Sequence, residues 1–126
     1  MKSLAGENYI VVNYHYVGNP KPGFSGIHSC SVEAFEKQMR FLGQNYNGLS
    51  VQDIFAAAQS GRRGKFCSIT FDDGLMDQYE YALPILNKYS LPAAFFIITS
   101  TLHGELPLAH KIHLLLSRFP VIDLIS

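Results

Sequence analysis

The sequence has no tryptophan, only two cysteines and no net charge, because its ten lysines and arginines balance ten aspartates and glutamates. A balanced charge argues against nucleic acid or an anionic membrane as the main partner. Cys30 and Cys67 are too few for a disulfide framework and favour a reducing, cytoplasmic environment. No apolar run approaches the roughly 20 residues of a membrane span. The first residues also lack the apolar run of a signal peptide.

What the sequence does contain fits one globular domain over residues 1–126, with 48% hydrophobic residues and a core rich in tyrosine and phenylalanine. Short apolar runs predict buried strands at 9–14, 66–71 and 93–98. Amphipathic spacing predicts helices at 32–42, 50–61, 76–89 and 108–119. Strands that are apolar throughout and alternate with such helices predict a parallel sheet covered by helices, which is an α/β fold.

The ends of three of these helices carry recognisable signals. Ser31 is an expected N-cap, and Ser50 with Asp53 matches a capping box. Pro84 should bend or restart the 76–89 helix, because its ring clashes with the preceding turn. In that helix Tyr79, Leu83 and Leu86 are expected on one face.

Two adjacent carboxylates, Asp72 and Asp73, follow the 66–71 strand and precede Gly74. Two like charges side by side raise the pKa of one of them, and such pairs are typical of metal sites or proton transfer. The alternative is a strand-to-helix turn in which one aspartate caps the next helix and glycine relieves the backbone. That alternative leaves the second aspartate unexplained.

His15 should lie near this pair. It follows the first strand, and the carboxyl ends of parallel strands meet at one edge of the sheet, where α/β proteins place their sites. A partly buried histidine that is hydrogen-bonded at a strand end accounts for His15 equally well, so both interpretations stay open.

The segment Thr70-Phe71-Asp72-Asp73-Gly74 resembles the first motif of the polysaccharide deacetylase (NodB-homology) family of metal-dependent carbohydrate esterases. Residues 11–17 resemble the first strand of that family, and 81–86 with 91–97 resemble the helix and strand that follow the motif. The resemblance therefore covers most of the chain, from about residue 9 to 98. Residues 27–33 and 108–116 are similar to a branch found in surface-glycan biosynthesis.

The resemblance implies a parallel-strand (β/α) barrel-like fold, of which this chain is an incomplete N-terminal half. It also implies a hydrolase that removes acetyl groups from N-acetylhexosamines with a divalent metal, usually zinc. By position, Asp72 is the implied general base and Asp73 the implied metal ligand. The implied partner is an N-acetylated carbohydrate.

The chain departs from the family pattern, because the second motif, His-Ser/Thr-x-x-His, is absent, as are the motifs with the base-orienting arginine and the general-acid histidine. Catalysis by this chain alone is therefore expected to be incomplete. The alternative is a non-catalytic fragment that binds glycan, or one that a second chain completes through an exposed sheet edge. A phosphatase domain fits less well, since no glycine-rich phosphate loop is present.

His110 and His113 are weak candidates to replace the missing pair. Their spacing puts both imidazoles on one helix face, within reach of one ion. Yet this spacing is one residue shorter than in the family motif, so polar histidines on an amphipathic surface helix are the preferred interpretation.

Overall fold

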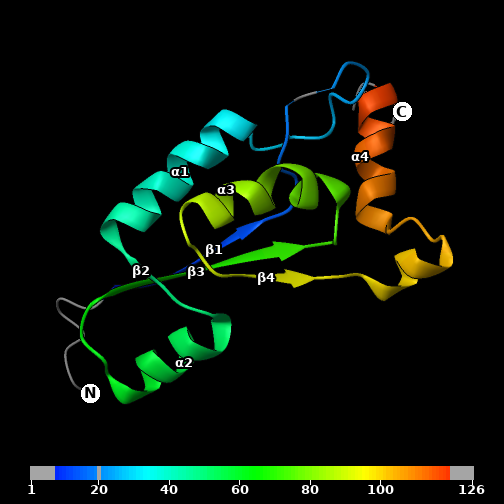
Figure 1. Ribbon diagram of the computed structural model, residues 1–126. Coiled ribbons are helices and arrows are strands. Elements are labelled where there is room, and N and C mark those ends of the chain that lie inside the picture. The colour runs from blue at the N-terminus through cyan, green and yellow to red at the C-terminus, as the bar shows by residue number, and fades with distance from the viewer. Residues whose placement is uncertain (1–7, 20, 120–126) are drawn as a thin grey trace.

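The structure is a computed structural model that describes residues 8–19 and 21–119. The elements in order are β1 (Asn8–Tyr14), α1 (Val32–Asn45), β2 (Asn47–Gly48), α2 (Val51–Ser60), β3 (Lys65–Asp72), the π-helix η1 (Gln78–Ala82), α3 (Leu83–Lys88), β4 (Ala93–Phe96), the 3-10 helix η2 (Thr99–His103) and α4 (Leu108–Arg118). The protein is an α/β chain in which α1 and α3 lie over one face of a parallel sheet, whereas α2 lies apart from them near the start of β3 (Figure 1).

The central strand of the sheet is β3, which pairs in parallel with β1 on one side and with β4 on the other. The short strand β2 pairs with the start of β3. Because all strands are parallel, their carboxyl ends meet at one edge, and α4 and the loop before α1 lie at that edge (Figure 1). The predicted strands are confirmed, except that β4 is shorter than expected and β2 was not expected.

Local capping fixes the first two helices as predicted. The Ser31 hydroxyl accepts a hydrogen bond from the Ala34 N–H at the start of α1. The Ser50 hydroxyl accepts one from the Asp53 N–H at the start of α2, which ends at Gly61 in the left-handed conformation (φ 64°). Each cap satisfies backbone groups that a helix end leaves unpaired.

The predicted 76–89 helix is divided into η1 and α3, and Pro84 lies in the first turn of α3, where a proline needs no N–H partner. The wider π-helical turn shifts the phase of the side chains. Gln78 and Ala82 become the buried residues of η1, whereas Tyr79 is exposed. Tyr79 is therefore exposed and Leu86 is buried, so the expected common face of these residues is wrong, because it assumed a regular period of 3.6 residues.

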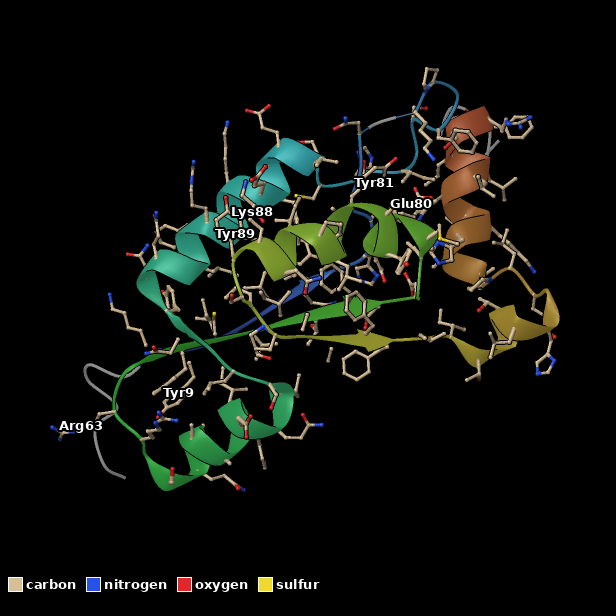
Figure 2. All side chains as sticks on the ribbon, viewed as in Figure 1. Tyr9, Arg63, Glu80, Tyr81, Lys88 and Tyr89 are labelled. Carbon is tan, nitrogen blue, oxygen red and sulfur yellow. The ribbon has the colours of Figure 1, made fainter. Side chains whose placement is uncertain are left out.

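The core lies between the sheet and the helices α1 and α3. Phe71 stacks on Tyr14 and Phe95, and the fully buried Phe35 packs edge-on against Tyr14. At the end of α3, Lys88 and Tyr89 both donate to the Glu36 carboxylate of α1, which holds the two helices together (Figure 2). This aromatic layer supports β3 directly before the two aspartates.

On the opposite face of the sheet β3 is buried, but the strands that flank it are partly exposed in the described part of the chain. Val11 of β1 and Phe96 of β4 are each more than half exposed. Self-association through such strands stays a prediction. Among residues 8–19 and 21–119, none of the helices has the length and apolar character needed to span a bilayer.

Candidate functional site

The two aspartates lie in a tight turn at the carboxyl end of β3. Asp73 has a φ of 77° and Gly74 a φ of 65°, so two consecutive residues adopt the left-handed conformation. Aspartate is among the few side chains that tolerate this region, and glycine has no penalty there. A Cβ on Gly74 would also lie 3.1 Å from side-chain atoms of Ile97. The backbone thus turns sharply, which separates the side chains of the two carboxylates.

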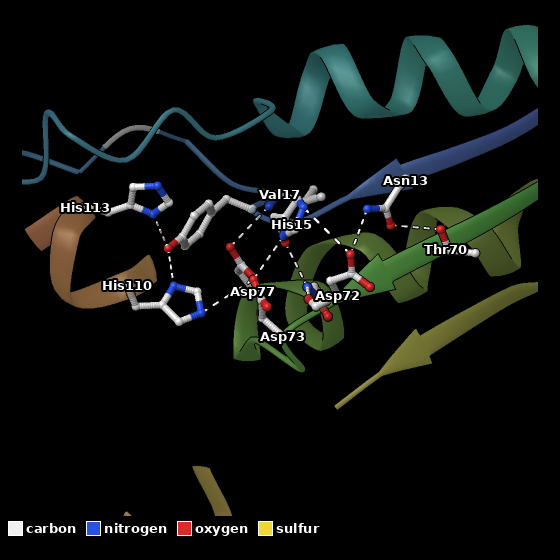
Figure 3. A network of polar contacts seen from close by, with 11 residues as sticks. Asn13, His15, Val17, Thr70, Asp72, Asp73, Asp77, His110 and His113 are labelled. Atoms are coloured by element: carbon white, nitrogen blue, oxygen red, sulfur yellow. Dashed lines mark hydrogen bonds and ion pairs between the residues drawn. The ribbon is translucent and has the colours of Figure 1, made fainter. Parts of the chain in front are cut away.

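Asp73 faces two imidazoles from distant parts of the chain (Figure 3). Its Oδ2 lies 3.0 Å from Nδ1 of His15 and 3.5 Å from Nε2 of His110. The register explains the first contact, because Tyr14 of β1 is opposite Phe71 of β3 and His15 follows directly. The Asp73 side chain is only 16% exposed, so its charge is partly shielded from water.

Asp72 has different partners. Its Oδ2 accepts a hydrogen bond of 2.8 Å from the Asn13 amide, and the Asn13 carbonyl accepts one of 2.8 Å from the Thr70 hydroxyl (Figure 3). The Thr70 contact fixes which end of the amide faces the carboxylate. Nε2 of His15 lies 3.8 Å from the same Asp72 oxygen, so His15 bridges the two aspartates.

The histidines of α4 join this site, which corrects the preferred interpretation of the sequence. His110 is buried and its Nε2 faces Asp73, so it is not on a surface helix. The Tyr16 hydroxyl contacts Nδ1 of His110 and lies 3.0 Å from Nδ1 of His113. His113 is half-buried and contacts the Tyr16 hydroxyl, whereas the ion pair with Asp73 is made by His110. The i, i+3 spacing therefore brings one imidazole to the carboxylate and both to the tyrosine.

Burial and nearby charge raise the pKa of two groups beside the site. Burial, together with the charges of Asp73 and Asp77, raises the pKa of the Tyr16 phenol. Burial also raises the pKa of Asp77, although its Oδ2 accepts a hydrogen bond from the Val17 N–H. Asp77 and Tyr16 also line a pocket of about 510 Å³ beside the site, together with aromatic residues that include Phe24 and Tyr81.

Gln78 ties the strand ends together from beneath the site. Its buried amide nitrogen donates to the backbone carbonyl of His15 at 2.8 Å and to that of Asp72 at 2.6 Å. One side chain thus holds the carboxyl ends of β1 and β3 at a fixed separation. No pattern in the sequence indicated this role, because it is the π-helical turn that points Gln78 inward.

Replacing Gln78 with leucine is expected to lower the free energy of unfolding by roughly 2–4 kcal/mol, because two buried carbonyls lose their donor. The amide oxygen of Gln78 finds no partner among the described residues, so its removal offsets part of that loss. Urea unfolding measures the effect, with Gln59→Leu on the exposed side of α2 as the control. Equal free energies of unfolding for the two variants would show that the two hydrogen bonds of the Gln78 amide do not stabilise the fold.

The donor chemistry at Asp73 fits a zinc site, because carboxylate oxygen and imidazole nitrogen are zinc ligands. The donor count does not reach the three protein ligands of a catalytic site. Within the described ranges, no group of three or more His, Cys, Asp or Glu side chains is arranged to hold a metal ion. Oδ2 of Asp73 and Nε2 of His110 face each other across the site at 3.5 Å.

Sequence reasoning identified Asp72, Asp73 and His15 and the structure brings them together, but it missed Asn13 and Tyr16. Asn13 lies on β1 at the register position opposite Thr70, which a correct strand pairing would have revealed. Tyr16 follows His15 at the end of the first strand, and its contact with α4 spans 94 residues of sequence.

Comparisons with known proteins give matches to polysaccharide deacetylases. A family model described as polysaccharide deacetylase matches residues 59–113. YxkH of Bacillus subtilis (strain 168), a curated protein that carries the name of a polysaccharide deacetylase, is 35% identical over 83 residues. That alignment covers 64% of this chain and 28% of YxkH.

Two solved structures share the fold. The deacetylase PplD of Streptococcus pyogenes, solved in complex with acetate, matches with a TM-score of 0.63 and 26% identity over 71% of this chain and 42% of PplD. A de-N-acetylase from Aggregatibacter actinomycetemcomitans matches with a TM-score of 0.63 and 27% identity over 80% of this chain and 43% of that protein. The chain therefore spans less than half the length of these relatives.

Proposed function

Since this chain belongs to the polysaccharide deacetylase family, we propose that it serves the metal-dependent N-deacetylation of a carbohydrate. The predicted family and α/β fold class are confirmed. The proposed reaction is hydrolysis of the acetamide of an N-acetylhexosamine in a glycan or glycan precursor, with a surface glycan as the favoured source. The observation that carries the proposal is the pair of carboxylates at the end of β3, of which Asp73 faces His15 and His110.

Asp73 and His110 would hold the metal, with His15 as a neighbour on the other side of Asp73. A bound zinc would supply a Lewis acid that polarises the acetyl carbonyl. Asp72 would take the proton of the attacking water, since a positioned carboxylate is a competent general base. Because Asn13 occupies Oδ2 of Asp72, we assign this proton transfer to Oδ1. Acetate leaves, and the amide nitrogen takes up a proton to become the free amine.

The neighbouring pocket would take part of the sugar chain. Its volume of about 510 Å³ and its aromatic lining are typical of small-molecule sites. Tyr16 belongs to both the pocket and the site, so a ligand in the pocket would lie next to the reacting group.

A zinc titration by calorimetry tests the metal role of Asp73. We expect the native chain to bind zinc stoichiometrically and Asp73→Asn to lose that binding, because an amide does not supply an anionic ligand. Asparagine tolerates the φ of 77°, so this variant keeps the turn. Asp72→Asn is the matched control and should bind as the native chain does. Zinc binding that survives in Asp73→Asn would overturn the assignment.

A second candidate function is a non-catalytic, deacetylase-like segment that binds glycan or is completed by a partner chain. The observation in its favour is that the described residues hold no three-ligand group. It predicts that the native chain binds N-acetylated oligosaccharides without zinc and self-associates in light scattering. A monomer that binds zinc and releases acetate would exclude it.

A further inference from the structure

The Tyr16 hydroxyl connects the two histidines of α4 through their equivalent nitrogens. It contacts Nδ1 of His110 and lies 3.0 Å from Nδ1 of His113, and both imidazoles stand roughly edge-on to the tyrosine ring. Figure 3 shows the two labelled histidines on either side of this contact, with His110 turned toward Asp73. One hydroxyl thus serves two imidazoles, only one of which faces a carboxylate.

A hydroxyl has a single proton, so it can donate to one imidazole and must accept from the other. A neutral imidazole has one N–H donor and one bare nitrogen. The two histidines are therefore forced into opposite tautomers whenever both hydrogen bonds are made. If His110 donates through Nδ1, then His113 accepts at Nδ1 and carries its proton on Nε2, and the reverse holds for the other direction.

The Asp73 carboxylate decides which direction prevails. Its Oδ2 lies 3.5 Å from Nε2 of His110. Without a cation between them, two sets of lone pairs would repel, so Nε2 of His110 carries the proton and Nδ1 accepts from Tyr16. With a cation at Asp73, Nε2 must be bare to bind it. His110 then carries its proton on Nδ1 and donates to Tyr16, which in turn donates to His113.

We propose that Tyr16 is a positioning residue that makes His110 the metal ligand and couples the tautomer of His113, a non-ligand, to metal binding. Outer partners of this kind fix the tautomer and orientation of a ligand histidine. The change moves no net proton between the pair and the solvent. His110 releases a proton from Nε2, and His113 takes one up at Nε2. Between the rings, the Tyr16 proton moves to Nδ1 of His110, and the Nδ1 proton of His113 moves to the Tyr16 oxygen. The proposal rests on the proposed metal site, but half of its test needs no metal.

Nitrogen-15 NMR of histidine-labelled protein measures the tautomers directly. The spectra are recorded at about pH 8.5, which is alkaline of the reference pKa of about 6.5 for a free imidazole. We expect the metal-free native chain to show the Nε2–H tautomer for His110 and the Nδ1–H tautomer for His113. His110→Gln and His113→Gln assign the signals. In Tyr16→Phe, which keeps the ring and removes the hydroxyl, His113 should revert to the tautomer mixture of an isolated imidazole.

Added zinc should move the His110 signal to that of a bound Nε2 and switch His113 to the Nε2–H tautomer without binding it. Tyr16→Phe should lower the zinc affinity tenfold to a hundredfold and leave His113 unchanged by zinc. Tyr79→Phe, which removes an exposed hydroxyl elsewhere, should behave as the native chain does in both measurements.

The outcomes separate this proposal from the proposed function. Native-like His113 signals in Tyr16→Phe, or zinc coordination by both histidines, would overturn the coupling of the His113 tautomer to metal binding through Tyr16, even if zinc binds. Failure of the native chain to bind zinc would overturn the metal site. In that case, opposite tautomers of His110 and His113 in the native chain that are lost in Tyr16→Phe would still establish that Tyr16 sets the tautomers of the two histidines. Equal tautomers of His110 and His113 in the native chain would overturn this role of Tyr16 as well.

Discussion

Replacing Asp72 with asparagine is expected to lower the rate of acetamide hydrolysis by a factor of roughly 10²–10⁴, with zinc affinity close to native. An amide cannot accept the proton that the attacking water gives up, so the loss falls on the chemical step. The hydrogen bond from Asn13 to Oδ2 survives, because the new side chain can present its oxygen to the Asn13 amide. The variant therefore keeps the shape of the site and removes its basicity.

The measurement is acetate release from an N-acetylated oligosaccharide by the zinc-loaded protein, together with a zinc titration of the same samples. Asp53→Asn, on α2 and away from the site, is the matched control for loss of one carboxylate. If Asp72→Asn keeps more than about a tenth of the native rate, a positioned general base at this residue is excluded. If both rate and zinc affinity fall, Asp72 is a ligand and the assignment of the two aspartates must be exchanged.

The parts of the fold that the sequence predicted are those that local chemistry determines. Ser31 and Ser50 cap their helices through hydrogen bonds that span three residues. β3 was recognisable because residues 66–71 are buried on both faces and combine aromatic and β-branched residues, with Ser68 and Thr70 as the polar members. The motif at Asp72 and Asp73 could be found for the same reason, since two adjacent carboxylates after a buried strand have few structural explanations.

The rest depends on tertiary contacts that no local pattern reports. The π-helix turns Gln78 inward and Tyr79 outward, although their sequence fits a regular helix equally well. His110 differs from an ordinary polar helix residue only because Tyr16 and Asp73 meet it in space. The surface helix was preferred because the spacing of His110 and His113 differs from that of the family motif. In the structure His110 faces Asp73 although the spacing differs.

The candidate site is built from three segments that are far apart in the sequence: the end of β1, the turn after β3, and α4. Gln78 holds the first two together, because its amide donates to a backbone carbonyl at the end of each strand. The third segment is held by the contacts of its histidines with Tyr16 and Asp73 and by the loop before α1. The docking of α4 is therefore the point at which the site is most sensitive to a small change.

Gly26 is the residue at which that docking can be tested. A Cβ at this position would lie 2.4 Å from the carbonyl oxygen of His113 and 2.8 Å from the backbone nitrogen of Ser117. The Gly26 N–H also donates to the Ser117 hydroxyl at 2.9 Å. The loop thus contacts the backbone of α4 so closely that only glycine fits, and an added methyl group must push the helix away.

Gly26→Ala is accordingly expected to lower zinc affinity by roughly a hundredfold, although the residue touches no ligand atom, because sites of this kind tolerate displacements of only about 0.5 Å. Calorimetry measures the affinity, and the His110 tautomer reports whether the helix has moved. Gly18→Ala is the matched control, since its Cβ would meet the Tyr81 ring at an ordinary 3.6 Å. Both changes reduce the entropy of the unfolded chain equally, so a loss confined to Gly26→Ala must come from the contact with α4. Native zinc affinity in Gly26→Ala would mean that α4 does not carry a metal ligand, and the third segment would have to be removed from the site.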